Sequence, residues 1–354
     1  MSLFARDPSA ERIPVSVLTG FLGSGKTTVL NRLLRDPALA DTAVIVNEFG
    51  EVGLDHLMME AIDGELVVMA SGCICCTIRS DLESTLRDLL GRAREGEIPP
   101  FARVVVETTG LADPAPIAQM LLNNPLVVGF FRLDAVLATV DTVHGARQLD
   151  AQPESVKQAA MADRLILTKT DLAEPAVVGA LHRRLAALNP TAARIEAVMG
   201  AVSAGQLFDA GWYDPATKSP DVARWLRDEA LSDDGHGHGH HHHDVNRHDG
   251  GIAAFALSFD APLDWDQVNL WLAGLRHAYG EQLLRVKGIL SLRGEDLPVA
   301  IHGVHHVFHP PVRLPGWPDG DRRSRIVFIA RELDAATVRG HFDEVAAEMT
   351  AGAV

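Results

Sequence analysis

One segment near the start of the chain restricts its fold more than any other. Residues 20–27 read Gly-Phe-Leu-Gly-Ser-Gly-Lys-Thr, which matches the phosphate-binding pattern GxxxxGK[ST]. A short apolar run at 13–18 precedes this segment, and residues 27–34 after it have the apolar spacing of a helix. A strand, a glycine-rich turn and a helix in this order predict an α/β nucleotide-binding domain.

The pattern of the first domain continues over the next 150 residues. Short β-branched runs alternate with amphipathic stretches, which indicates a parallel sheet with helices on both faces. The runs expected to be strands are 42–46, 103–106, 135–140 and 164–167, and the expected helices are 81–94, 115–122, 155–161 and 176–188. We therefore expect a P-loop NTPase domain with a mainly parallel sheet over residues 12–230.

A change of composition separates this domain from the rest of the chain. Residues 231–251 are rich in Gly, His and Asp and have no apolar period, so we interpret them as a linker or an exposed loop. Strand patterns follow at 252–259, 285–292 and 325–329, with helical patterns at 265–277 and 335–349. A smaller α+β C-terminal domain is expected over 252–350, and a length of 354 residues fits two domains.

The P-loop pattern assigns a role to each of its residues. The backbone N–H groups around Gly20, Gly23 and Gly25 would surround the phosphates of a nucleoside triphosphate. Lys26 would neutralise the β and γ phosphates, and the Thr27 hydroxyl would be a ligand of Mg²⁺. Both side chains would thus also serve catalysis.

A second strand end is expected to complete the phosphate site. The apolar run 103–106 leads into Glu107, and Gly110 follows three positions later. Because strand ends of a parallel sheet meet at one edge, Glu107 would bind a water ligand of magnesium and Gly110 would sense the γ-phosphate. The alternative is a buried strand that happens to end in an acidic residue.

A third strand end is the candidate for reading the base. Thr168, Lys169 and Asp171 lie where guanine-specific proteins have an NKxD motif, with Thr168 in place of the usual asparagine. Asp171 would accept hydrogen bonds from N1 and N2 of guanine, and the stem of Lys169 would lie on the base. Adenine has no such pair of donors, so the choice of guanine would depend on Asp171. An ordinary aspartate at the start of a helix is the alternative.

The three cysteines form the most unusual local feature. Cys73, Cys75 and Cys76 lie before Ser80 to Glu83, whose Ser-x-x-Glu pattern predicts the start of a helix. The dipole of that helix would favour thiolates, which select zinc or Cu⁺ and also accept cobalt or nickel. A redox sensor and inert packing remain alternatives. Glu48 and Glu51 are candidates for a further ligand.

The position of the cysteines suggests a link to the nucleotide. They lie between the P-loop and Glu107, in the interval where nucleotide switches change shape when the γ-phosphate is lost. A closed zinc site is worth about 10–16 kcal/mol, which is too tight for rapid transfer. A switch that changes metal affinity by ~10⁴-fold, about 5.5 kcal/mol, would release the ion.

Charge and hydropathy limit the partners. Lys and Arg number 32 against 47 Asp and Glu, a net charge of −15, so nucleic acid is not an expected partner. No apolar run is long enough to cross a bilayer, and the N-terminus has no secretory pattern. We therefore expect no membrane partner and a cytoplasmic location, where thiols stay reduced.

Five motifs together resemble one known family. GFLGSGKTT, NEFGEVG, SGCICC, ETTGLADP and LTKTD, in this order and spacing, are similar to those of the CobW-type GTP-binding metallochaperones. The resemblance covers roughly residues 12–230 and continues into a C-terminal domain with the segments 301–306 and 326–329. It implies a P-loop GTPase that loads zinc, or sometimes cobalt, into client proteins or cofactor pathways.

The resemblance also implies roles for individual residues. Phosphate binding would extend over 20–28, which adds Ser24 and Thr28 to the residues above. The CxCC cysteines would bind the metal, and switch roles would fall to Glu48, Glu51 and Glu107, with Glu48 a candidate for orienting the attacking water. Some relatives have a glutamate just before the Asn-Glu-Phe segment, where this chain has Val46.

Three functional hypotheses follow. The first is a GTPase that carries a divalent metal, most often zinc, to a client protein, with GTP, Mg²⁺ and Zn²⁺ as ligands. The second is cobalt delivery for cobalamin synthesis, and the third is a zinc buffer whose nucleotide site is vestigial. The histidine tract from His236 to His248 suits either a metal collector or a solvated spacer. Packing is an equal or better reading for His144, His302, His305 and His306. A homo-oligomer remains open.

Overall fold

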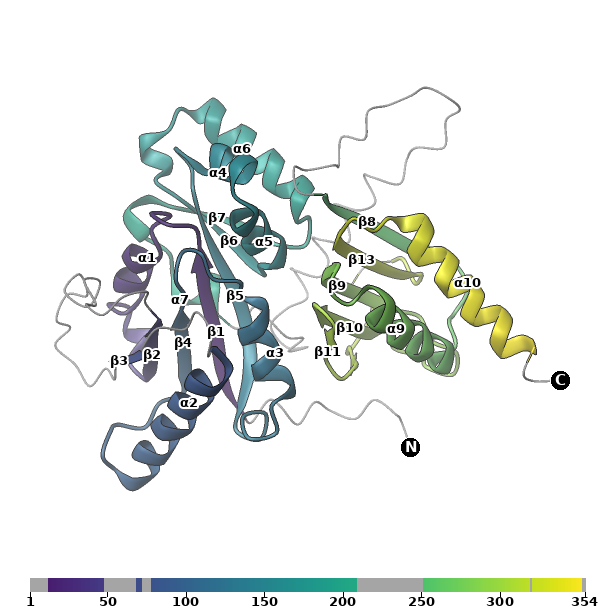
Figure 1. The fold of residues 1–354 in the computed structure, drawn as a ribbon, viewed down its shortest axis with the longest axis horizontal. Coiled ribbons are helices and arrows are strands. Elements are labelled where there is room, and N and C mark those ends of the chain that lie inside the picture. Colours follow the sequence, from purple (N-terminus) through teal and green to yellow (C-terminus); the bar gives the residue numbers. More distant parts are fainter. Residues whose placement is uncertain (1–11, 48–67, 72–77, 209–250, 319, 352–354) are drawn as a thin grey trace. The chain divides into compact units, whose positions relative to one another are not determined.

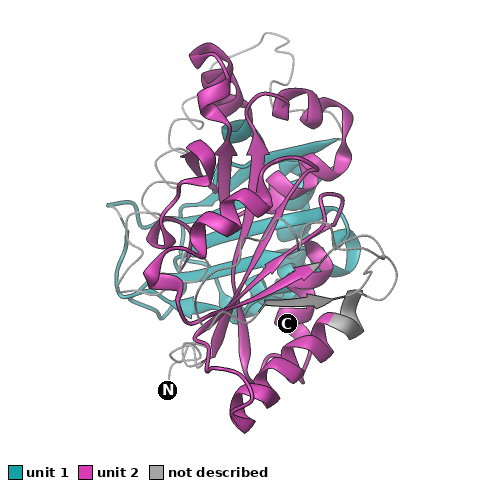
Figure 2. Cartoon of the chain, turned by 90° about the vertical axis from the view of Figure 1, so that its left-hand side faces the viewer, with its two compact units in different colours: residues 1–7, 185–191, 213–354 teal, residues 8–184, 192–212 magenta. Residues whose placement is uncertain are grey.

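The computed structural model describes residues 12–47, 68–71, 78–208, 251–318 and 320–351. It divides the chain into two compact units, one of residues 8–184 and 192–212 and the other of residues 1–7, 185–191 and 213–354, which Figure 2 colours separately. Several predicted site residues lie outside the described ranges. These are Glu48, Glu51, Cys73, Cys75, Cys76 and the histidine tract, together with most of the predicted linker.

The N-terminal part of the chain forms a seven-stranded sheet (Figure 1). Its order is β3-β2-β4-β1-β5-β6-β7, and every neighbouring pair is parallel. The strands are β1 Ile13–Gly20, β2 Thr42–Asn47, β3 Val68–Ser71, β4 Arg103–Glu107, β5 Phe131–Asp141, β6 Arg164–Thr168 and β7 Ala193–Ala197. The carboxyl ends of all seven therefore share one edge of the sheet.

Helices cover both faces of this sheet (Figure 1). They are α1 Lys26–Leu33, α2 Ile78–Glu95, α3 Ala115–Asn123, α4 Gly145–Ala151, α5 Pro153–Met161, α6 Pro175–Leu188 and α7 Ala204–Leu207. On one face, Leu30 of α1 and Leu207 of α7 belong to a buried cluster with Leu18, Val105 and Leu137 of the sheet. Helices α3 and α5 instead contact β1 and β5 outside this cluster. The predicted P-loop α/β architecture is confirmed.

Most predicted elements differ from the observed ones by one or two residues, and the exceptions are informative. Helix α2 begins at Ile78, so Ser80 lies within its first turn and is not the cap that the Ser-x-x-Glu pattern predicts. None of the residues 78–80 is a helix breaker. Burial of Leu82, Leu86 and Leu89 stabilises the helix that begins there. Strand β5 starts at Phe131, four residues before the predicted run, because its pairing with β1 already begins there.

The C-terminal part of the chain forms a second, antiparallel sheet. The order is β11-β10-β9-β13-β8, and β12 also pairs with β10. The elements are β8 Ile252–Phe259, α9 Trp265–Tyr279, β9 Leu283–Leu290, β10 Val299–Val304, β11 Val307–Phe308, β12 Val312–Arg313, β13 Ser324–Arg331 and α10 Ala335–Ala351. The predicted strand at 285–292 is thus two residues too late, and the predicted α+β class is confirmed.

Aromatic side chains form the centre of the second core. The indole of Trp271 lies edge-on to Phe328 and Phe342, with ring centroids at 5.9 and 5.1 Å. Its Nε1–H donates to the carbonyl oxygen of Val338 at 3.2 Å, so the one polar atom of this buried ring is satisfied. Helices α9 and α10 are thereby fixed to one face of the sheet.

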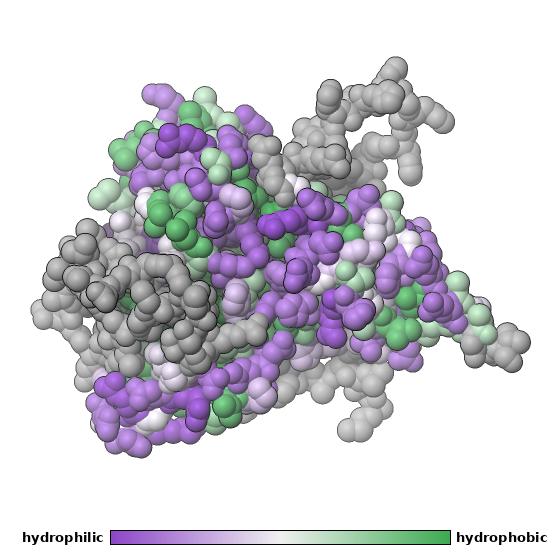
Figure 3. Space-filling model, in the orientation of Figure 1, coloured by the Kyte–Doolittle hydropathy of each residue, from purple (hydrophilic) through white to green (hydrophobic). Residues whose placement is uncertain are grey.

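On the face that Figure 3 shows, the described residues are mainly hydrophilic. In the view of Figure 3, apolar side chains occur between polar ones in small groups. Among the described residues, no helix combines the length and the apolar character that crossing a bilayer requires.

Candidate functional site

The carboxyl edge of the parallel sheet gathers the predicted site residues. Pairing of β1 with β4 places Leu18 beside Glu107, and pairing of β1 with β5 places Gly20 beside Thr139. Strand β6 then sets Thr168 beside Asp141. Residues from distant parts of the sequence thus meet at one sheet edge, as the parallel arrangement predicts.

The glycines of the P-loop are required by its backbone. Gly20, Gly23 and Gly25 have φ values of 140°, 72° and 91°, a region that residues with a Cβ rarely adopt. A Cβ on Gly20 would lie 2.5 Å from the carbonyl oxygen of Thr139 and 2.8 Å from Oγ of Ser24. The loop therefore turns tightly against β5 and leads into α1 at Lys26.

Lys26 folds back over the loop that precedes it. Its Nζ donates to the carbonyl oxygen of Gly20 at 2.9 Å and to that of Phe21 at 3.3 Å. The ammonium group is thus held beside the turn of backbone that would surround the phosphates. This is the place from which it can neutralise phosphate charge.

Thr27 and Glu107 meet directly. The Thr27 hydroxyl donates to Oε1 of Glu107 at 2.8 Å, and Glu107 is buried. An alcohol oxygen and a carboxylate side by side are the donors that Mg²⁺ prefers, since this ion takes oxygen ligands and keeps several waters. The residues present therefore fit a magnesium ion.

Gly110 lies against the P-loop itself. A Cβ at this position would come within 2.6 Å of the backbone N of Leu22 and 2.8 Å of its Cα. Only a glycine lets the segment after β4 approach so closely. The structure thus brings the predicted γ-phosphate sensor into contact with the predicted phosphate loop.

The predicted base-reading residues take three different positions. Thr168 is buried, and its hydroxyl donates to the carbonyl oxygen of Ser24 at 2.7 Å, so this side chain supports the P-loop from below. Lys169, with φ of 58°, donates from Nζ to the carbonyl oxygen of Gly23 at 2.9 Å. Asp171 is exposed in the short turn Thr170–Leu172.

Two residues of this edge are not predicted from the sequence. The hydroxyl of Thr139 lies 2.6 Å from Oγ of Ser24 beneath the P-loop. Asp141 is buried and accepts from Nζ of Lys169 at 2.6 Å and from the backbone N of Val143 at 2.8 Å. The available signal was an apolar run, 135–140, that ends in a carboxylate, as the run before Glu107 does.

The four histidines outside the tract that the sequence singled out are either buried or at the surface. His144 is exposed at the start of α4, and His306 is exposed in the turn after β10. His302 and His305 are buried, and the ring of His302 stacks on that of His309 with centroids 5.5 Å apart. Within the described ranges, no three His, Cys, Asp or Glu residues are grouped to hold a metal ion.

The environment of His309 changes its acidity. Burial of the ring lowers its pKa well below the ordinary value of 6.5, and the positive charge of Arg285 lowers it further. The imidazole is therefore neutral at pH 7. This residue follows β11 in the C-terminal unit and is not part of the P-loop edge.

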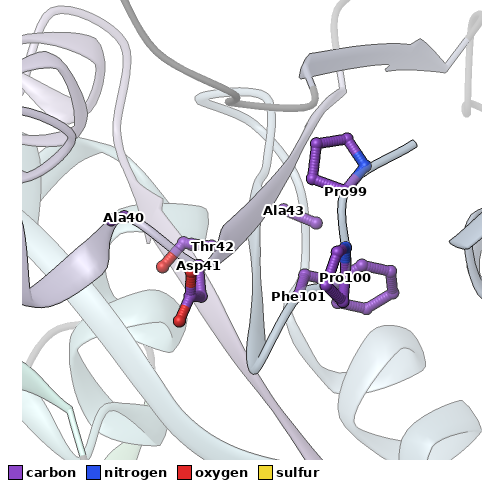
Figure 4. A pocket seen from close by; sticks show the side chains of 7 residues that line it. All are labelled: Ala40, Asp41, Thr42, Ala43, Pro99, Pro100 and Phe101. Atoms are coloured by element: carbon purple, nitrogen blue, oxygen red, sulfur yellow. The ribbon is translucent and has the colours of Figure 1, made fainter.

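A small pocket of about 80 Å³ lies away from these residues (Figure 4). Its walls come from residues 40–43 at the start of β2 and residues 99–101 just before β4. Both strands begin here, so the pocket is at the amino edge of the sheet, opposite the P-loop. We assign it no part in nucleotide binding.

Comparison with known proteins agrees with this geometry. The model of the CobW/HypB/UreG nucleotide-binding domain matches residues 14–196, and that of the cobalamin synthesis protein cobW C-terminal domain matches residues 252–346. The chain belongs to the CobW family. The suspected resemblance is thus confirmed, and both matched domains of the CobW family are present.

Relatives in the CobW family match over nearly the whole chain. "Zinc chaperone YjiA" of Escherichia coli is 33% identical over 93% of this chain and 98% of its own length. "Zinc-regulated GTPase metalloprotein activator 1" of Saccharomyces cerevisiae is 28% identical over 93% of this chain and 82% of its own length. A crystal structure of Zn(II)-bound YjiA GTPase from E. coli superposes with a TM-score of 0.71 at 29% identity, covering 94% of this chain and 99% of that one.

Proposed function

We propose that this protein is a GTP-hydrolysing metallochaperone that binds zinc and transfers it to a metal-requiring client protein. Its affinity for the metal depends on which nucleotide is bound. Relatives that match over 93% of this chain are named zinc chaperone and zinc-regulated GTPase, which supports this proposal. We also propose a cytoplasmic location, where reduced thiols remain able to bind metal.

The observation that carries the proposal is the register of three neighbouring strands. Val46 of β2 pairs with Glu107 of β4, and Asn47 pairs with Ser71 of β3. The segment with Glu48 therefore leaves the sheet beside Glu107, and the segment with the cysteines leaves it one strand further on. Both candidate ligand segments start at the edge that carries the phosphate loop.

GTP would be bound and hydrolysed by the residues of that edge. The P-loop backbone would surround the phosphates, Lys26 would neutralise them, and Asp171 would select guanine. When bound between Thr27 and Glu107, Mg²⁺ would supply positive charge at the phosphate oxygens. We propose that Glu48 orients the attacking water. Its segment follows β2, which is two strands away from β1, and β1 leads into the P-loop and Lys26.

Zinc is the cargo in this scheme. The thiolates of Cys73, Cys75 and Cys76 would hold it, and Glu51 is the candidate fourth ligand. This chain has Val46 where some relatives have a glutamate. The side chain of Val46 is buried and belongs to the apolar core at the sheet. Cobalt can use the same donors, and competition between the two ions decides which one the protein prefers.

The test measures zinc dissociation constants for the nucleotide-free, GDP-bound and GTP-analogue-bound protein. We expect them to differ, and a triple Cys73→Ser, Cys75→Ser, Cys76→Ser variant to lose the tight site. His306→Ala, which changes an exposed histidine elsewhere, is the matched control and should leave all three constants unchanged. Equal constants in the three states, or tight zinc binding in the triple variant, would contradict the proposal.

A further inference from the structure

The loop that follows β4 is held from two sides. On one side Gly110 lies against the P-loop backbone at Leu22. On the other side, two consecutive residues of α5, Lys157 and Gln158, contact the loop through their side chains. The position of Gly110 is therefore set jointly by the phosphate loop and by a helix that begins 43 residues later.

Gln158 holds the backbone of this loop. Its Nε2 donates to the carbonyl oxygen of Gly110 at 3.2 Å and to that of Ala112 at 3.0 Å, and the residue is only 2% exposed. Both neighbours are acceptors, so the amide nitrogen, which is the donor, must face them.

The other atom of the amide shows that this position is not filled for packing alone. Oε1 of Gln158 is buried and has no hydrogen-bond partner in the part of the chain that the structure describes. An apolar side chain of the same length would avoid the cost of burying that oxygen. The glutamine thus supplies two donors to the loop at the expense of an unmatched acceptor.

Lys157 fixes the far end of the same loop. Its Nζ donates to Oδ2 of Asp113 at 2.6 Å, and Oδ1 of Asp113 accepts from the backbone N of Ala115 at the start of α3. The two contacts from α5 therefore span the loop from Gly110 to Asp113.

We infer that Gln158, supported by Lys157, is a positioning residue that sets where the Gly110 backbone stands relative to the γ-phosphate. It acts through the loop and does not touch the nucleotide. This inference rests on the proposed function, because only a protein that distinguishes GTP from GDP needs such a restraint. The helix that bears both residues leads into β6, whose last residue supports the P-loop.

The test compares the full-length chain with Gln158→Met and Lys157→Met variants. Dissociation constants are measured for GDP and for a non-hydrolysable GTP analogue, with kcat and KM for GTP alongside. We expect Gln158→Met to weaken binding of the GTP analogue by about tenfold, which is the scale of one to two ordinary hydrogen bonds. The same variant should lower kcat and leave the affinity for GDP unchanged within about twofold. Lys157→Met should act in the same direction with a smaller effect.

A structural role alone would not change the ratio of the two affinities. The control is Arg184→Met, which removes an ion pair to Asp150 between α6 and α4 and should leave that ratio unaltered. An unchanged ratio in Gln158→Met, or equal weakening of both nucleotides, would overturn the inference. If Gln158→Met does not fold, Lys157→Met decides by the same ratio. Absence of turnover in the wild-type chain contradicts the proposed function, and the affinity ratio still decides the inference.

Discussion

The hydroxyl of Thr27 donates a 2.8 Å hydrogen bond to Oε1 of Glu107. The two residues are 80 positions apart, and they meet because β4 lies next to β1, which leads into the P-loop. An alcohol and a carboxylate held together in this way form one half of a magnesium site before any ion arrives. The first prediction tests this pair.

Replacing Glu107 by Gln keeps the shape of the side chain and removes its charge. We expect Glu107→Gln to lower Mg²⁺ affinity or GTP turnover by about 10- to 100-fold. This is the usual range for residues in the second coordination sphere of a metal. Titration of the GTPase rate with Mg²⁺ measures it. Thr27→Ala should impair the same step, and the double variant should lose less than the sum of the two. An unaltered Mg²⁺ dependence in Glu107→Gln would falsify the assignment.

Replacing Gly110 by Ala tests the contact between the two loops. A Cβ here would lie 2.6 Å from the Leu22 backbone, so one loop must move, at a cost of about 1–3 kcal/mol. We expect weaker binding of a GTP analogue and slower hydrolysis, measured by calorimetry and by phosphate release. Gly129→Ala is the matched control, because a Cβ at Gly129 meets nothing within 4 Å. Equal behaviour of the two variants would show that the close approach has no functional weight.

Replacing Asp141 by Asn tests the support of Lys169. The carboxylate of Asp141 is buried and bonds the Lys169 ammonium at 2.6 Å, and hydrogen bonds to charged groups contribute about 1.5–3 kcal/mol. Because Lys169 also donates a hydrogen bond to the carbonyl oxygen of Gly23, we expect the affinities for GDP and for the GTP analogue to fall by about the same factor. Equilibrium binding of both nucleotides provides the measurement. Asp150→Asn, at an exposed ion pair, should leave binding intact. A loss confined to one nucleotide would argue against this role.

The pKa of His309 predicts how stability depends on pH. The folded-state pKa lies well below 6.5, so well above pH 6.5 the ring is neutral in both the folded and the unfolded state and does not change stability with pH. As the pH falls toward and below 6.5, the unfolded chain takes up a proton that the folded chain does not, so the free energy of unfolding decreases. We expect the melting temperature to fall between pH 7.5 and 5.5.

A His309→Gln variant separates this effect from other titrations. Its melting temperature, measured by calorimetry over the same interval, should depend less on pH than that of the wild-type chain. Asp321 does not interfere. Hydrogen bonding to Arg323 lowers the pKa of Asp321 from 3.8, so its contribution to stability is constant over this interval and is lost only as the pH falls below 3.8. Parallel curves for the two proteins would contradict the prediction.

The elements that carry the nucleotide site were predictable because each has a strong local pattern. The run 13–18 followed by GxxxxGKT can only be a strand, turn and helix, and Glu107 ends an uninterrupted β-branched run. Strands β3 and β7 were not predicted. The first has four residues and the second, Ala193–Ala197, alternates polar and apolar residues at the margin of the sheet. Pairing with a neighbour defines them more than their own composition does.

The limits of prediction at the site have a similar cause. Thr168 was predicted only as part of a base-reading segment, in place of the usual asparagine, and no sequence pattern indicated that its hydroxyl donates to the carbonyl oxygen of Ser24. Thr139 and Gln158 belong to no motif at all. Their importance comes from strand register and from how α5 lies beside the loop, and both depend on contacts between distant parts of the chain.

Strand β3 has one partner, β2, among the described strands, and it is four residues long. Such a margin opens more easily than the centre of a sheet, since few backbone hydrogen bonds hold it. A metal ion bound by residues that follow both β2 and β3 would link the two strands. The free energy needed to separate β3 from β2 would then be larger when the metal is bound. Amide hydrogen exchange in β3 should therefore slow when the metal binds and return to its earlier rate when the metal is released. This exchange rate would report metal occupancy without a direct measurement of the metal.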